Sequence, residues 1–501
     1  MRLAGRGFCA ALAAVFFLQI LLLSHYASAA SPPADLSDFA YGLDASINVP
    51  SSPLYESPTR INVSAHIRNH NEGRDYIVYL LSQKNGTWIT ERALGVVQRN
   101  ASADFEFDFL AKYSGISKSK AQYAIVASGD SVPLGQYFYV EEDWSRYEEQ
   151  QRQKLSGFAQ FVIPAGAILI SLIIIVLAKW AYDSKAKFSF KSEYTEESFF
   201  IPQLKGRPIS EVIADVLINP LFWAFEIIML AVALTTVWGS MQQAQDTNEI
   251  IVLTFLAGLL MPLVYFLLVW IYNNLVEKMP LRFLAGAFMW GIAAAVISLV
   301  INSAQAQFLL GGLGLDSAFV ILLTTAIIAP IIEEVAKGLG LLAMWGHHEF
   351  SDSLHGLHLG LAVGLGFSFV ENWLYFSSKT QPLELGIYAW LSIIVYRSFF
   401  NSMAHACFSA ALGASLGWAR SHGWAGLAAL SFIPGVLTAI VLHSIFNITA
   451  ILDGFEALSA DFPVFKYNPT MVIALISIMV VLLVGATIER RYTRINRAAK
   501  K

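Results

Sequence analysis

Two adjacent carboxylates in an apolar stretch are the residues of this sequence that could most readily do chemistry. Glu333 and Glu334 lie within residues 318–345, a mainly apolar run that also holds Lys337. A charge at the centre of a membrane helix costs about 2.5–3.5 kcal/mol, so such groups persist where they face a polar cavity or one another. On a helix Glu333 and Lys337 are i,i+4 neighbours and can form an ion pair on one face. Glu334 is rotated by about 100° and is free to point elsewhere.

Three later apolar stretches also carry polar side chains at helical spacing. Together they contribute one carboxylate, two imidazoles, one guanidinium and three amides: Glu371 and Asn372, then Arg397, Asn401 and His405, then His443 and Asn447. Residues four positions apart share one helix face, which applies within the last two sets. Gly360, Gly364 and Gly366 allow a neighbouring helix to approach the second stretch closely.

Carboxylates and imidazoles together can activate a water molecule. A buried glutamate can act as general base, or two or three Glu and His side chains can hold a divalent metal whose bound water attacks a carbonyl. Asn447 and a histidine N–H could stabilise the resulting oxyanion. Cys407 is two residues from His405 and therefore points to another helix face. No serine is placed where it could act as a nucleophile beside these histidines. The set therefore favours water-mediated hydrolysis.

The four stretches resemble the PrsW family of intramembrane proteases, part of the wider group that includes the CAAX prenyl endopeptidases. The shared pattern is EExxK, FxxxEN, an Arg and a His on one helix, and HxxxN. Here it is carried by residues 333–337, residues 367–372, Arg397 with His405, and residues 443–447. The resemblance covers residues 284–452 and implies an endopeptidase that acts on membrane-associated proteins.

The resemblance also implies a role for each site residue. Glu333 or Glu334 would activate water, Asn447 would stabilise the oxyanion, and Glu371, His405 and His443 would be metal ligands or polarising groups. The supporting residues would be Lys337, Asn372 and Arg397. The implied cofactor is a divalent metal, with zinc as a candidate. The CAAX enzymes carry histidine where this chain has Glu371, which argues against a prenyl-protein substrate and leaves metal dependence open.

Composition places the chain among multi-pass membrane proteins. Its residues are 56% hydrophobic and 14% charged, and the net charge of −4 gives no indication of nucleic-acid binding. We expect about nine transmembrane helices, with the lipid bilayer and a membrane-protein substrate as partners. The expected spans are residues 159–180, 220–239, 250–272, 284–301, 317–345, 356–376, 386–418, 425–452 and 470–488. Those at 317–345 and 386–418 are longer than the roughly 20 residues that a bilayer requires, and Pro330 gives the first a place to kink or break. The two cysteines exclude a cysteine-rich metal site.

The order of segments predicts an exported β domain before the helices. Residues 1–30 have the basic end, apolar core and small-residue site of a signal peptide. Residues 31–142 alternate short apolar and polar runs, typical of a small extracytoplasmic β-sandwich, and Asn62, Asn85 and Asn100 head glycosylation triplets. The remaining segments are a stalk at 143–158, the first transmembrane helices with a cytoplasmic loop at 159–283, the protease-like core at 284–452, and a last helix with a basic tail at 453–501.

The loop charges predict orientation, and two other functions compete with proteolysis. Basic residues after the first span and at the end of the chain predict an extracytoplasmic β domain and a cytoplasmic C-terminus. A proton-coupled transporter or channel could also use intramembrane Glu and His residues. A non-catalytic receptor would keep them for helix packing, with Arg397 merely neutralising Glu371.

Overall fold

The computed structural model describes two compact units, residues 1–148 and 149–501. The described residues are 37–38, 42–49, 53–84, 87–113, 115–128, 134–187, 247–276, 279, 281–347, 349–380, 382–422, 428–458 and 467–499, with isolated positions between 213 and 231. The expected signal peptide, the Asn85 triplet and most of the expected cytoplasmic loop lie outside them.

The first unit is all-β. One sheet has the order β1 (Ser37–Asp38), β8 (Leu134–Asp143), β7 (Lys118–Ser128), β4 (Tyr76–Lys84) and β5 (Thr87–Val97). The other has β2 (Leu43–Asn48), β3 (Thr59–Asn69) and β6 (Ala101–Ala111). Burial alternates along β3, as expected from the alternating apolar and polar residues within residues 31–142. Rings of the two sheets meet, because Phe107 of β6 lies 6.2 Å from Phe138 of β8 between centroids.

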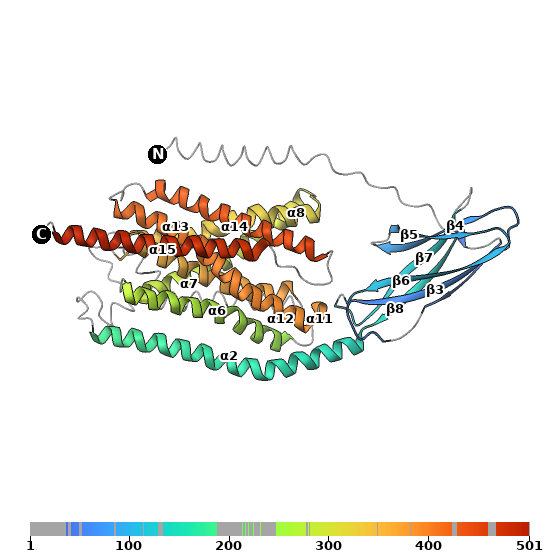
Figure 1. The fold of residues 1–501 in the computed structure, drawn as a ribbon, viewed down its shortest axis with the longest axis horizontal. Helices are drawn as coiled ribbons and strands as arrows, with labels where there is room; N and C mark the ends of the chain where they lie inside the picture. Colours follow the sequence, from blue (N-terminus) through green and yellow to red (C-terminus); the bar gives the residue numbers. More distant parts are fainter. Residues whose placement is uncertain are drawn as a thin grey trace. The chain divides into compact units, whose positions relative to one another are not determined.

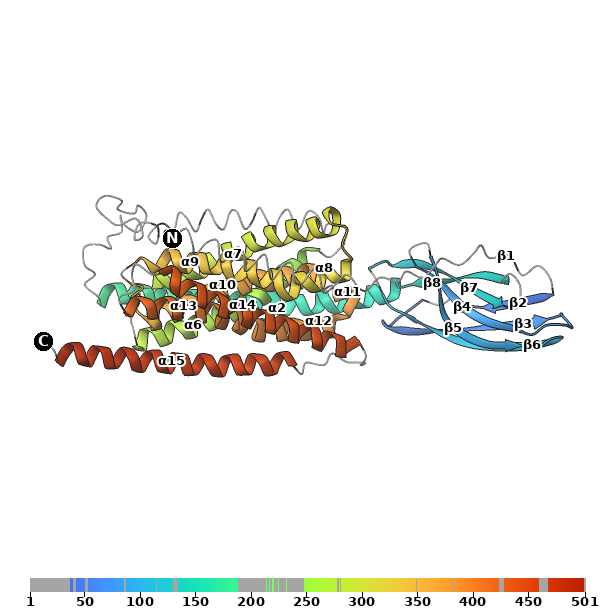
Figure 2. The same cartoon turned by 90° about the horizontal axis from the view of Figure 1, so that it is seen from above.

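The second unit is helical (Figures 1 and 2). Its longer helices are α2 (Ser145–Lys187), α6 (Thr247–Val276), α7 (Leu281–Gln307), α9 (Ala329–Trp345), α10 (Ser353–Leu374), α13 (Ser402–Ser421), α14 (Ala428–Leu458) and α15 (Tyr467–Ala499). Shorter ones are α8 (Ser317–Leu323), α11 (Pro382–Leu385) and α12 (Ile387–Tyr396).

Seven helical stretches among the described residues are long and apolar enough to cross a membrane. Two of the nine expected spans are not among them. The span expected at residues 220–239 lies almost entirely outside the described residues. The span expected at residues 386–418 is a helix that continues through α12 and α13.

Helix α10 is the centre of the helical unit, and glycines set its spacing. Nearly every residue of α10 is buried. A Cβ atom at Gly364 would lie 2.2 Å from the main-chain oxygen of His405, and one at Gly366 would lie 1.9 Å from that of Phe288. Only glycine permits these contacts, so the predicted close approach is confirmed. The contact at Gly364 brings α13, and with it His405, against α10.

Short π-helical segments interrupt both of the spans that are longer than a bilayer requires. They are η3 (Thr324–Ile328), between α8 and α9, and η5 (Arg397–Asn401), between α12 and α13; η2 (Phe308–Gly312) and η4 (Tyr375–Lys379) follow α7 and α10. The expected break near Pro330 is thus confirmed, since Pro330 follows η3 directly. Single-turn π segments are frequent at functional sites.

Candidate active site

Side chains from α9, α13 and α14 form a buried polar cluster in the apolar bundle. Lys337 Nζ donates to Glu334 Oε1 at 2.7 Å and to His405 Nδ1 at 2.8 Å. His443 Nδ1 lies 2.9 Å from the same Glu334 oxygen. Glu334 and Lys337 are fully buried, so this ion pair is out of contact with solvent.

Lys337 pairs with Glu334, which differs from the expected i,i+4 pair with Glu333. The ammonium lies 3.8 Å from the centroid of the Phe367 ring, on the side where His405 supplies an acceptor. An ammonium group has three donors, and this position satisfies it with a carboxylate, an imidazole nitrogen and an aromatic face. Tertiary neighbours therefore decided which glutamate the lysine neutralises.

Glu333 is left as the more accessible carboxylate of the pair. Its side chain is 13% exposed, and Asn302 of α7 donates to its Oε1 at 3.3 Å. Its Oε2 lies 3.8 Å from His443 Nε2, too far for a direct hydrogen bond and close enough for a bridging group. Sequence reasoning did not identify Asn302. The one sequence feature that could have indicated Asn302 is an amide side chain near the end of an apolar span.

Glu371 lies beside the cluster and is held by two partners. Arg397 donates to its Oε1 at 2.9 Å, so the neutralising role considered for this arginine is confirmed. His405 Nε2 lies 2.6 Å from its Oε2, although the two atoms lack hydrogen-bond alignment. The Arg397 guanidinium also stacks on Tyr375, at 3.8 Å from the ring centroid. The structure thus brings together Glu371 and His405, two residues to which the family resemblance assigned related roles.

The amides predicted to support the site bind the protein's own groups. Asn372 donates to Ser402 Oγ at 3.1 Å and accepts from Asn401 at 3.0 Å, which ties α10 to α13. Asn447 donates to the main-chain oxygen of Thr325 at 2.8 Å. Both residues lie near the catalytic candidates, and the hydrogen bonds found for them are to the scaffold.

The donor atoms of the cluster fit a divalent metal ion. Among the described residues, Glu333, His405 and His443 each place one ligand atom within 4.8 Å of the others. Glu334 Oε2 and His405 Nε2 are buried without a hydrogen-bond partner, as expected of atoms that serve another group. A metal-bound histidine usually donates its second N–H to a carboxylate. His443 has that arrangement with Glu334, whereas His405 faces Lys337.

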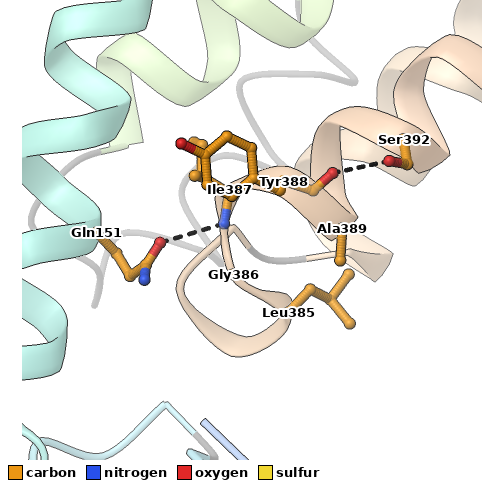
Figure 3. A pocket seen from close by; sticks show the side chains of 7 residues that line it. All are labelled: Gln151, Leu385, Gly386, Ile387, Tyr388, Ala389 and Ser392. Carbon is orange, nitrogen blue, oxygen red and sulfur yellow. Dashed lines mark hydrogen bonds between the residues drawn. The ribbon is translucent and has the colours of Figure 1, made fainter. Parts of the chain in front are cut away.

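A separate pocket lies between α2 and the start of α12 (Figure 3). Gln151 accepts a hydrogen bond from the Ile387 N–H at 3.2 Å, and Ser392 donates to the Tyr388 carbonyl. The lining contains no carboxylate or imidazole, so the pocket provides none of the groups considered above.

Comparison with known proteins agrees with this geometry. A family model described as "PrsW family intramembrane metalloprotease" matches residues 279–484. A curated relative, Protease PrsW of Clostridioides difficile (strain 630), is 22% identical over 175 residues, which is 35% of this chain and 69% of the relative. The match includes every helix that contributes to the cluster, and it points to a protease. Residues 279–484 of this chain are thus similar to the PrsW family of intramembrane proteases.

Proposed function

We propose that this protein is an intramembrane endopeptidase that hydrolyses membrane-associated proteins with water activated at the buried cluster. The observation that carries the proposal is the convergence of Glu333, Glu334, His405 and His443 in one apolar bundle. Burying these groups is costly, so their presence indicates function. The β domain precedes the helices and, in the orientation expected from the loop charges, lies outside the cytoplasm.

We assign the role of general base to Glu333. It is partly exposed, whereas Glu334 is enclosed and already accepts from Lys337 and His443 on one oxygen. A base must reach the water whose proton it abstracts, which favours Glu333. Glu334 then orients His443 through Nδ1 and leaves Nε2 directed at the reacting region. Lys337 balances the charge of Glu334.

Glu371 and His405 form the second half of the proposed site. Arg397 fixes one oxygen of Glu371, and the other lies against His405 Nε2. In the proposed reaction this pair returns a proton to the leaving amine after the peptide bond breaks. The proton that Glu333 takes from water passes to this pair after the amine has left, so both groups return to their starting protonation states and the hydrolysis balances.

Glu333, His405 and His443 are the residues that would hold a metal, and with an ion bound there Glu333 and His405 would act as ligands in place of general base and proton donor. When bound there, a divalent ion such as zinc would polarise the scissile carbonyl and acidify a water molecule. Glu334 would still orient His443, and Glu371 would carry the proton to the leaving amine. The transporter alternative gains no support from the comparisons, which match a family of proteases.

Cleavage of single-span membrane proteins by the purified chain in liposomes tests the proposal. We expect His443→Ala to lower the cleavage rate by at least about a hundredfold, because it removes a ligand and the partner of Glu334. A chelator decides the role of Glu333: cleavage lost with chelator and restored by zinc would make Glu333 a metal ligand, and cleavage unaffected by chelator would make it the general base. His422→Ala is the matched control, since His422 is exposed at the end of α13. Equal cleavage by wild type and His443→Ala would contradict the proposal.

A further inference from the structure

Asn447 donates a hydrogen bond to the main-chain oxygen of Thr325, a carbonyl that Pro330 leaves without a regular main-chain donor in the helix before Glu333 and Glu334. In a π-helix each carbonyl accepts from the N–H five residues ahead, and in an α-helix from the one four ahead. For Thr325 these donors would be Pro330 and Ala329. Pro330 has no N–H, and the Ala329 N–H donates to Thr324 instead. Both regular main-chain donors are therefore lost to the Thr325 carbonyl.

Asn447 supplies the missing donor from another helix. Its Nδ2 lies 2.8 Å from the Thr325 oxygen. A carbonyl left unsatisfied within an apolar bundle is costly, and side chains of neighbouring helices commonly satisfy the groups that proline frees. The amide of Asn447 thus replaces a main-chain N–H.

The same face of α14 makes a second contact beyond the break. His443, one turn before Asn447, binds Glu334 at 2.9 Å. Helix α14 therefore contacts the broken segment on both sides of Pro330, at Thr325 and at Glu334. The two contacts fix how α9 leaves the break, and Glu333 and Glu334 lie one turn beyond Pro330.

We propose that Asn447 is a positioning residue that clamps the Thr325 carbonyl freed by Pro330 and thereby orients the glutamate pair. This differs from the oxyanion role that the HxxxN pattern suggests for Asn447. Because the reaction served is the proteolysis proposed above, the inference rests on that function. The effect that it predicts on the helix around Pro330 can also be measured by a method that does not depend on cleavage.

A double-mutant cycle between Asn447 and Pro330 separates the two roles. Pro330→Ala restores a main-chain N–H within reach of Thr325, so the clamp is no longer needed. We expect Asn447→Ala to lower kcat by about tenfold or more in the wild-type background, by loss of one partly buried hydrogen bond. In the Pro330→Ala background we expect the same substitution to lower kcat less than about twofold. Pro164→Ala, in α2, is the matched control background and should leave the full tenfold effect.

Hydrogen–deuterium exchange of the same variants gives the readout that does not depend on activity. We expect faster exchange of the amides in residues 324–334 for Asn447→Ala, and wild-type exchange when Pro330→Ala is added. If Asn447→Ala lowers kcat equally in both backgrounds and exchange does not change, Asn447 acts on the substrate and the inference is wrong. If wild type cleaves no substrate, the proposed function fails, while the exchange data still decide the inference.

Discussion

The two units of this protein both contain histidine–carboxylate pairs, in opposite surroundings. In the β domain His66 lies 2.5 Å from Asp104 and His70 lies 2.8 Å from Asp44, with every side chain at least 44% exposed. In the helical unit His443 lies 2.9 Å from Glu334, and both are almost fully buried. Water screens the first kind of pair and cannot reach the second. Contact distance alone therefore does not identify a site; the burial of charged groups within an apolar bundle does.

The largest effect on stability is expected where the buried ion pair is broken. Lys337→Met would leave Glu334 as an uncompensated buried carboxylate, and we expect a loss of about 3–5 kcal/mol in the free energy of unfolding. Denaturant titration in detergent measures it. Lys154→Met, at an exposed position on α2, is the control and should change little. A small loss in Lys337→Met would mean that the pair is not buried as described.

A second substitution sharpens this result. In the variant Lys337→Met with Glu334→Leu, both charges are gone, and much of the stability should return because no charge is left unpaired. Cleavage should be absent in this double variant, since His443 has lost Glu334 as its partner. Recovery of stability without recovery of activity would separate the structural cost of the pair from its chemical use.

The smallest effect is expected in the β domain. His66→Ala removes one partner of an exposed cross-strand pair, and we expect less than about 1 kcal/mol change in stability and an unchanged cleavage rate. Unfolding monitored by β-sheet circular dichroism and the liposome assay check the two parts. A loss as large as that of Lys337→Met would remove the contrast between the two units.

The cluster could be predicted from the sequence because charge in an apolar span is costly wherever it falls. Glu333, Glu371 and His443 are each recognisable from their own stretch. The partner of Lys337 could not be predicted, since the choice between Glu333 and Glu334 depends on Phe367 and His405 in other helices.

The fold, like the site, could be predicted where local residue chemistry decides it and could not where distant residues meet. The close approach at Gly364 follows from residue size, and the break near Pro330 follows from proline chemistry. Asn302 is one amide in an apolar span, and only packing brings it to Glu333. The donor that Thr325 receives likewise comes from a residue 122 positions away.

The measurement that tests the central claim most directly compares Glu333→Gln with Glu334→Gln for both cleavage and thermal stability. We predict that Glu333→Gln lowers kcat by about 10²–10⁴-fold, the usual contribution of a general base, with the melting temperature unchanged. Glu334→Gln should lower both, because it breaks the buried pair with Lys337. Glu384→Gln, at an exposed position, is the control. Wild-type cleavage by Glu333→Gln would contradict the proposed site.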